Sequence, residues 1–110
     1  MSNADIHAAV EEGYVGLDRL FEHRVRFAIA VLLARETTLS FARFKDLLGE
    51  SDGNLGAQLR KLEDEGAVAV EKRFVGRKPQ SLYRLTEEGA KRLSAHLDAL
   101  DRLIAAGRND

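Results

Sequence analysis

Five basic side chains and no acidic one lie between residues 72 and 84, in a chain of 110 residues whose formal net charge is −1. The bases are Lys72, Arg73, Arg77, Lys78 and Arg84. The first 18 residues have the opposite character, with four acids and no lysine or arginine. Unopposed positive charge on an otherwise neutral chain favours contact with a polyanion. The alternative is a solvated hairpin whose charges protect an exposed strand edge.

A second group of polar side chains recurs at helical spacing between residues 53 and 65. Three leucines predict the buried stripe of this helix, namely Leu55, Leu59 and Leu62. The opposite face then presents Gly53, Ala57, Arg60, Lys61 and Asp64. Asn54 and Gln58 fall on one flank of that face, and Gly66 ends the helix. The outer surface of this helix is therefore polar and available to a partner.

The side chains on this outer surface are of types that contact nucleic acid. The carboxamides of Asn54 and Gln58 each carry a donor beside an acceptor, which suits N6 and N7 of adenine in the major groove. Arg60 and Lys61 lie further along the helix and suit phosphates or guanine. Backbone amides near Ser51, at the start of the helix, can hold a phosphate. The alternative for Asn54 and Gln58 is plain exposure to solvent.

Capping residues and glycines delimit the two helices that must position these groups. Ser40 caps a helix that Gly49 ends. Its inward side chains are Phe41, Phe44, Leu47 and Leu48. Ser51 or Asp52 caps the following helix. We assign Asp52 a capping role because its carboxylate would repel a phosphate if it pointed outward.

Two further helices are predicted before this pair. Ser2 and Asp5 cap a first helix, with an apolar side made of Ile6, Val10, Tyr14 and Leu17. Gly13 and Gly16 weaken this helix, so that one piece and two pieces both remain open. A central, nearly buried helix is predicted from Phe21 to Arg35. Its apolar positions are Val25, Phe27, Ala28, Ile29, Val31, Leu32 and Leu33.

A two-stranded hairpin and a long last helix follow. Alternating apolar residues predict the strands, Val68 and Val70 in the first, Tyr83 and Leu85 in the second. A loop over residues 75–80, which contains Gly76 and Pro79, joins them. Thr86 then caps a helix whose apolar stripe has heptad spacing, namely Leu93, Leu97, Leu100 and Ile104.

These elements together predict an α+β fold, mostly helical: a winged helix-turn-helix with a two-stranded wing. We expect residues 1–110 to form a single domain, with a core over 20–86 and terminal helices over 1–19 and 87–110. A helix of 20 residues is about 30 Å long, more than this small core can cover. We therefore expect the terminal helices to form a homodimer through the last helix's apolar stripe, with Ile6 and Val10 packed against it. The alternative is a last helix that packs back on its own domain.

The sequence resembles a known group of proteins between residues 24 and 93. Three segments, LSFARFKDLLGESDGNLGAQLRKLEDEGAV, GRKP and YRLTEEG, occur in the order and spacing of stand-alone winged-helix transcriptional regulators related to the MarR and ArsR groups. In particular they resemble the short family described as a winged-helix DNA-binding domain. The resemblance implies a dimeric DNA-binding regulator. Gly56 departs from it, because such proteins usually carry a polar or small helix former at that position.

The function predicted from these observations is sequence-specific binding of double-stranded DNA, with repression by occlusion. Asn54, Gln58 and Lys61 are expected to read bases, and Arg60, Arg77 and Lys78 to anchor the backbone. Ser51 and Arg73 complete the expected DNA contacts. The alternative is a winged helix that docks on another protein without binding DNA. A small-molecule effector between the wing domain and the terminal helices stays open, although few aromatic residues are available there: Tyr14, Phe21 and Phe27.

Several classes of function are disfavoured by what the sequence lacks. The chain has no cysteine, which removes disulfides, thiolate metal sites and cysteine nucleophiles. No constellation suggests an enzyme, a cofactor or a metal site, and the alternative that His7 and His96 meet as a metal or pH sensor is the weaker one. The longest apolar run, residues 27–34, is too short to span a membrane. The acidic N-terminus is unlike a signal peptide, so a cytoplasmic protein is expected.

Overall fold

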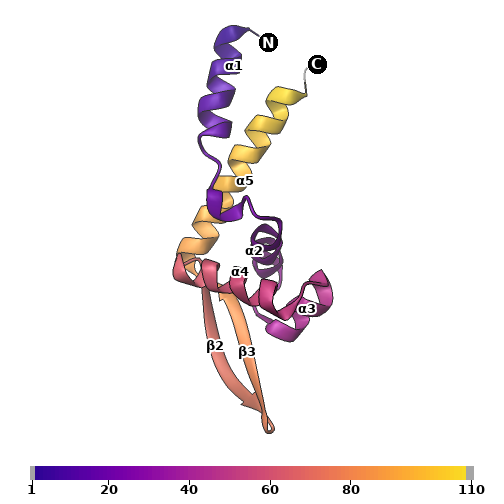
Figure 1. The fold of residues 1–110 in the computed structure, drawn as a ribbon. Coiled ribbons are helices and arrows are strands. Elements are labelled where there is room, and N and C mark those ends of the chain that lie inside the picture. Colours follow the sequence, from indigo (N-terminus) through magenta and orange to yellow (C-terminus); the bar gives the residue numbers. More distant parts are fainter. Residues whose placement is uncertain (1, 109–110) are drawn as a thin grey trace.

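The computed structural model describes residues 2–108. Its elements are α1 (Asn3–Ala9), η1 (Val10–Tyr14), η2 (Arg19–Phe21), α2 (Arg24–Arg35), β1 (Leu39–Ser40), α3 (Phe41–Leu48), α4 (Asp52–Asp64), β2 (Val68–Val75), β3 (Lys78–Leu85) and α5 (Glu87–Gly107). The molecule is elongated, with extents of 63 × 26 × 21 Å. The β2–β3 hairpin leaves the body at one end, and α1 and α5 leave it at the other (Figure 1). The predicted α+β class with mostly helical structure is confirmed.

The core lies where α2, α3, α4 and the base of the hairpin meet. The predicted leucine stripe of α4 is fully buried, and Ile29 of α2 and Phe44 of α3 lie against it in the same cluster. Two side chains expected to point inward do not: Val31 is 41% exposed and Leu47 is 44% exposed. Each lies at the edge of the apolar face of its helix, and that face is wider than the surface against which the helix packs. The core therefore takes only the centre of each apolar stripe.

Local capping chemistry produces the helix-turn-helix. The Ser40 hydroxyl accepts a hydrogen bond from the Arg43 amide at 3.1 Å, and Gly49 ends α3 in the left-handed region at φ 66°. The Ser51 hydroxyl then accepts from the Asn54 amide at 3.1 Å and starts α4. Glycine is the residue that takes a left-handed φ without a Cβ clash. The predicted turn between the two helices is confirmed.

The sheet has three antiparallel strands in the order β1-β3-β2, where two were expected. The short β1 pairs Leu39 with Tyr83 of β3, so the extended pair of residues before α3 completes the sheet. The connection between β2 and β3 is also shorter than predicted, because Val75 pairs directly with Lys78. Only Gly76 and Arg77 form the turn, and a positive φ at Gly76 alone is the pattern of a type II′ hairpin.

The start of α5 fits closely against the end of α4 and the first residue of the wing. Thr86 caps α5, as predicted, by accepting from the Gly89 amide at 2.9 Å. Its hydroxyl also donates to the Gly66 carbonyl at 2.6 Å, and its amide donates to the Ala67 carbonyl at 3.0 Å. A Cβ at Gly89 would overlap the Ala67 carbonyl oxygen. Position 89 therefore has room for glycine alone.

The terminal segments α1 and η1 pack against α5, and together they project from the body (Figure 1). Ser2 and Asp5 form a complete capping box at the start of α1. The helix continues without a break as one π-helical turn, η1, so the predicted segment is a single helix whose hydrogen-bond pattern changes at Val10. Gly13 and Gly16 allow η1 to approach α5 closely, since a Cβ on either would lie 3.0–3.2 Å from Leu103 or Ala99. Between residues 2 and 108, no helix has the length and apolar character needed to cross a membrane.

A cluster of polar and aromatic side chains joins the projecting helices to the body. Arg92 of α5 holds both carboxylate oxygens of Asp18, at 2.8 and 2.9 Å. His96 is 3% exposed; its Nδ1 accepts from the Asp18 amide at 2.9 Å, and its ring packs on Phe21 and Phe27. The Arg92 hydrogen bonds lower the pKa of Asp18. Burial lowers the pKa of His96, although the Asp18 and Glu22 carboxylates oppose this shift.

Replacement of Gly89 by alanine should destabilise the fold markedly. The added methyl group overlaps backbone rather than a movable side chain, so we expect a loss at or above the upper end of the roughly 1–3 kcal/mol typical of overpacking. Urea unfolding measures this loss. Gly107→Ala in the same helix is the matched control, because a Cβ there meets nothing within 4 Å. Equal stability of the two variants would contradict the close contact at Ala67.

The stability of the protein should fall in mild acid through His96. Its pKa is lower in the folded state than in the unfolded chain, so the stabilisation is present above roughly pH 6.5 and is lost as the pH falls below it. His96→Asn keeps an acceptor near Nδ1 but cannot titrate. Urea unfolding at pH 7.5 and 5 should show a smaller loss for this variant. His7→Asn, on the exposed side of α1, should behave as wild type.

Candidate nucleic-acid interface

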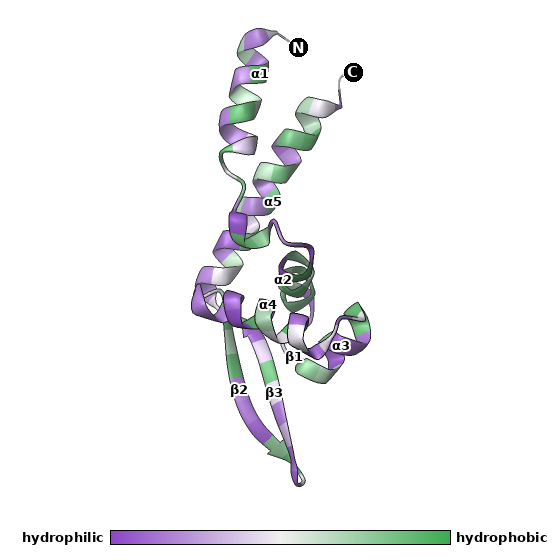
Figure 2. Cartoon of the chain, viewed as in Figure 1, coloured by the Kyte–Doolittle hydropathy of each residue, from purple (hydrophilic) through white to green (hydrophobic). Residues whose placement is uncertain are grey.

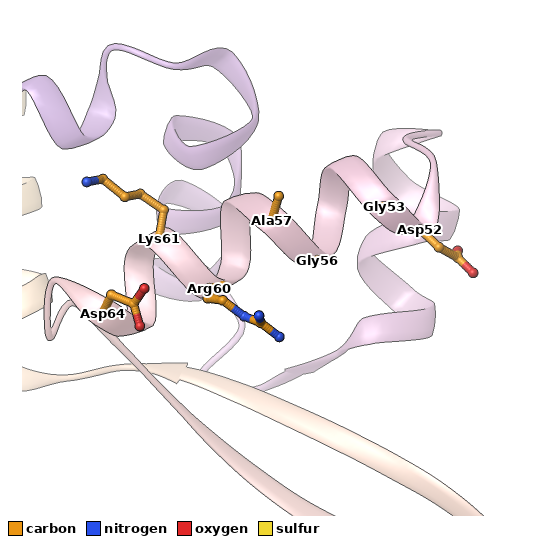
Figure 3. Close-up of a pocket in the computed structure, with 7 residues that line it drawn as sticks. All are labelled: Asp52, Gly53, Gly56, Ala57, Arg60, Lys61 and Asp64. Carbon is orange, nitrogen blue, oxygen red and sulfur yellow. The ribbon is translucent and has the colours of Figure 1, made fainter.

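The outer face of α4 is a shallow hollow with small residues at its centre and charged residues at its ends (Figure 3). The residues that line it are Asp52, Gly53, Gly56, Ala57, Arg60, Lys61 and Asp64. This set contains the predicted outer face of the helix. Arg60 and Asp64 extend toward the side of α4 that faces the wing, and Lys61 extends toward the other side (Figure 3). The helix thus presents accessible backbone between side chains of both signs.

The glycines on this face have no packing reason inside the described chain. A Cβ added at Gly53 or Gly56 would meet nothing within 4 Å, and neither residue has a positive φ. Glycine within a helix costs about 0.5–1 kcal/mol relative to alanine. Gly56, which departs from the resemblance, therefore weakens α4 without improving its packing. What the glycines do provide is room for close approach from outside.

The start of α4 is organised differently from our expectation. Ser51, not Asp52, is the cap. The Asp52 carboxylate instead pairs with Lys45 of α3 at 2.6 Å. The assigned capping role of Asp52 is wrong, because that residue already lies in the first turn, where its side chain extends back toward α3. The pair places opposite charges together next to the backbone amides that were expected to hold a phosphate.

Asn54 and Gln58 belong to a hydrogen-bond chain that ties α4 to α2. All three hydrogen bonds join side chains. The Arg26 guanidinium donates to Oε1 of Gln58 at 2.8 Å, and Nε2 of Gln58 donates to Oδ1 of Asn54 at 3.1 Å. Nδ2 of Asn54 then donates to the Glu50 carboxylate at 2.9 Å. A guanidinium only donates and an ionised carboxylate only accepts, so the two ends fix the orientation of both amides. The expected adenine contacts stay a prediction, and each would compete with these bonds.

The two faces of the wing differ in what they carry. Side chains alternate along a strand, and paired residues share a face. The face that packs under α4 at the base of the wing therefore continues outward as Val70 with Tyr83, Lys72 with Ser81, and Phe74 with Pro79. The opposite face continues as Glu71 with Leu82, Arg73 with Gln80, and Val75 with Lys78. We name the first of these the inner face of the wing.

A groove separates α4 from the inner face of the wing. Residues from both sides line it: Gly56, Leu59, Arg60, Glu63, Asp64, Val70, Lys72 and Tyr83. Two bases, Arg60 and Lys72, thus meet along one groove, together with two acids. Burial raises the pKa of Tyr83 at the floor of this groove, so its phenol is neutral at ordinary pH. Lys72 is one of the bases of the hairpin but was not among the expected DNA contacts.

The other predicted wing residues lie outside this groove. Arg73 is on the opposite face, where its Nε donates to Gln80 at 3.1 Å. Arg77 lies in the turn and Lys78 immediately after it, both exposed. Neither takes part in an ion pair within residues 2–108. Sequence reasoning missed the exposed Phe74, although extension of the alternation from Val70 by two more steps places it on the inner face.

The residues expected to form a dimer seam fall into two groups. Leu93 is 4% exposed and belongs to the core of its own chain, so its place in that seam has to be corrected: the body covers the first turns of α5. Leu100 is half-buried. Further out, Leu97 and Ile104 of α5, with Ile6 and Val10 of the terminal segment, are between 38% and 48% exposed. Apolar positions also mark the projecting helices in Figure 2.

The structure separates the two histidines of the sensor alternative, and a small-molecule effector stays a prediction. His96 is enclosed by Phe21 and Phe27, whereas His7 lies on the exposed α1. Two of the three aromatic side chains expected near an effector are therefore committed to packing. Across residues 2–108, no group of three potential metal ligands is brought together.

Comparison with known proteins identifies the fold and the family. The family model for the winged helix DNA-binding domain matches residues 25–104, and the chain belongs to this family. The same fold occurs in solved structures of transcriptional regulators. No curated protein is similar enough in sequence to match the chain.

Solved structures share this fold at low sequence identity. A transcriptional regulator homologue from Pyrococcus horikoshii OT3 is 20% identical with a TM-score of 0.77, over 96% of this chain and 99% of that one. A MarR-family transcriptional regulator from Enterococcus faecalis V583 is 23% identical with a TM-score of 0.62, over 97% and 86%. A MarR mutant from E. coli, complexed with operator DNA, is 19% identical with a TM-score of 0.62, over 92% and 75%.

The hydrogen bond between Arg26 and Gln58 should couple α2 to α4 energetically. In a double-mutant cycle of Arg26→Ala and Gln58→Ala, we expect a coupling energy of about 1 kcal/mol, as for a hydrogen bond with a charged donor that is partly solvated. Urea unfolding of the four proteins gives this value. Arg35→Ala, on the same helix but exposed, replaces Arg26→Ala in the control cycle, which should be additive. Coupling of the same size in both cycles would refute the direct contact.

Proposed function

We propose that this protein binds double-stranded DNA sequence-specifically as a homodimer and represses transcription by occupying its site. Residues 20–86 would contact DNA, and residues 1–19 and 87–110 would dimerise. The observation that carries the proposal is the groove in which Arg60 of α4 and Lys72 of the wing face the same space. Membership of a family of winged helix DNA-binding domains supports it.

The outer face of α4 has the shape that the major groove requires. That groove is about 12 Å wide and admits a helix. Gly53, Gly56 and Ala57 place little between the helix backbone and the base edges, while Arg60 and Lys61 reach guanine or phosphates from either side. Asn54 and Gln58, held by Arg26 and Glu50, position the helix. We therefore assign the main base and phosphate contacts of α4 to the outer face and a supporting role to its flank.

The wing supplies contacts beside those of α4. Arg77 and Lys78 at its turn are exposed cations suited to the phosphate backbone or to the minor groove, where arginine is favoured by the negative potential. Lys72 lies between the turn and α4 on the inner face. Arg60, Lys72 and Arg77 thus follow one another from the helix to the end of the wing, and Lys78 lies beside the turn on the opposite face. A line of bases of this kind can follow the DNA backbone from one groove to the next.

The dimer explains how a small interface can select one DNA site. The exposed apolar side chains of the projecting helices, led by Ile6, Val10, Leu97 and Ile104, offer a surface for a second copy. Two copies related by a two-fold axis present two α4 helices, and half-sites about 34 Å apart lie on one side of the DNA. A dimer bound in this way covers its site and excludes other proteins from it.

Fluorescence anisotropy with the duplex upstream of the protein's own gene tests this function. We expect saturable binding that is tighter than to a scrambled duplex and that weakens about 10³-fold or more between 50 and 200 mM salt if six or more phosphates are contacted. Arg60→Ala should weaken binding and reduce the salt dependence by about one phosphate. Arg102→Ala, exposed on α5, should bind as wild type. Absence of both sequence preference and salt dependence would overturn the proposal.

A further inference from the structure

The end of the wing exposes two large apolar side chains among its bases. Phe74 is 73% exposed and Val75 is 56% exposed, and no other large apolar side chain within residues 2–108 is as exposed as Phe74. A single exposed apolar residue is ordinary in a soluble protein. Exposure alone therefore does not indicate a role for Phe74, and its role has to be inferred from its position in the hairpin.

The strand register places Phe74 on the side of the wing that α4 occupies. Val70 and Tyr83 pack toward the core on this inner face. Lys72 follows two residues later and lines the groove with Arg60. Phe74 is the next side chain outward on the same face. A polyanion that lies against α4 and Lys72 therefore meets Phe74 next, whereas Val75 points to the other side.

The geometry of the hairpin fixes the backbone that carries Phe74. Its cross-strand partner is Pro79, whose ring fixes its own φ and offers a stiff apolar surface beside the phenyl ring. The turn has only two residues, Gly76 and Arg77, so the tip has little freedom to rearrange. Because the backbone is fixed and a phenylalanine side chain has only two χ angles, little conformational entropy is lost when Phe74 makes a contact.

The charges around Phe74 indicate what kind of partner it meets. No acidic residue occurs from residue 72 to residue 84, and Arg77 and Lys78 are exposed on the same hairpin. An apolar side chain on a hairpin that carries bases and no acid over this range is complementary to a ligand that combines flat apolar surfaces with negative charge. Duplex DNA has both, in its stacked bases and its phosphates.

The dimensions of DNA limit which part of the wing can reach the bases. The minor groove is only about 6 Å wide, and two strands about 4.8 Å apart with their side chains are broader than that. Only side chains that project from the hairpin can enter. We propose that Phe74 inserts into the minor groove next to the major groove occupied by α4, against a base step that it partly unstacks, while Arg77 and Lys78 hold the flanking phosphates.

This inference rests on the proposed DNA-binding function, and the Phe74→Ala variant tests it. Binding to the upstream duplex should weaken about 5- to 100-fold, as for loss of aromatic stacking on a base, while the slope of affinity against salt stays that of the wild type because no charge is removed. Val75→Ala, on the other face of the same tip, is the matched control and should bind as wild type. Arg77→Ala should instead reduce the slope of log affinity against log salt by about one, the value expected for one lost phosphate contact.

A spectroscopic measurement separates insertion from general weakening. Duplexes that carry 2-aminopurine at successive positions beside the α4 site report unstacking as a rise in fluorescence. Wild type should raise the signal at one step in each half-site, Val75→Ala should do the same, and saturating Phe74→Ala should not. Binding by Phe74→Ala equal to that of Val75→Ala, or the same fluorescence rise with both, would overturn the insertion and leave the tip to a protein partner. If the wild type prefers no duplex, the proposed function itself fails.

Discussion

The fold depends on the contact between the Ala67 carbonyl and the first turn of α5. This oxygen accepts from the Thr86 amide and leaves no room for a side chain at position 89, while the Thr86 hydroxyl bonds Gly66 and caps α5. Four segments meet there: the end of α4, the start of β2, the end of β3 and the start of α5. The direction of the projecting helices is therefore fixed relative to α4 and the wing. In a dimer, the same contact would set the separation of the two α4 helices.

Polar side chains around α4 divide into those used within the protein and those left to a partner. Arg26, Gln58 and Asn54 satisfy one another along the flank of α4, and Lys45 occupies Asp52. Arg60, Lys72 and Arg77 have no such partner among the described residues. For the first group, contact with a partner would require that hydrogen bonds already made within the protein be broken. The second group would lose only hydrogen bonds to water when it contacts a phosphate or a base. These side chains are therefore the better candidates for recognition.

Local chemistry made much of this fold predictable from the sequence. Ser40, Gly49, Ser51 and Thr86 mark helix ends through contacts within a few residues, so their roles could be inferred without the structure. The leucine stripe of α4 was equally local. What depends on distant residues was not predictable in the same way. The side chains on the flank of α4 bond within the protein because Arg26, 32 residues before Gln58, reaches them. Leu93 is buried in the core of its own chain because α5 begins against Ala67. A short extended segment at Thr38 and Leu39 is predictable from the sequence, but its pairing as β1 is not, because its partner Tyr83 is distant in sequence. The exposure of Phe74 was not predicted because it depends on how far the hairpin extends beyond the core.

The elongated shape also makes the protein a large electric dipole. The acids of the N-terminal segment, Asp5, Glu11 and Glu12, lie at the end where α1 projects, and the bases of the wing lie at the opposite end of a molecule 63 Å long (Figure 1). In the DNA complex proposed above, the field of the DNA would exert a torque on this dipole that turns the wing toward the phosphates before contact. Rotational search is then shortened, and salt that screens the field beyond about 10 Å slows association as well as weakening the complex. A net charge near zero is thus compatible with a large dipole moment, because the elongated fold holds the opposite charges far apart.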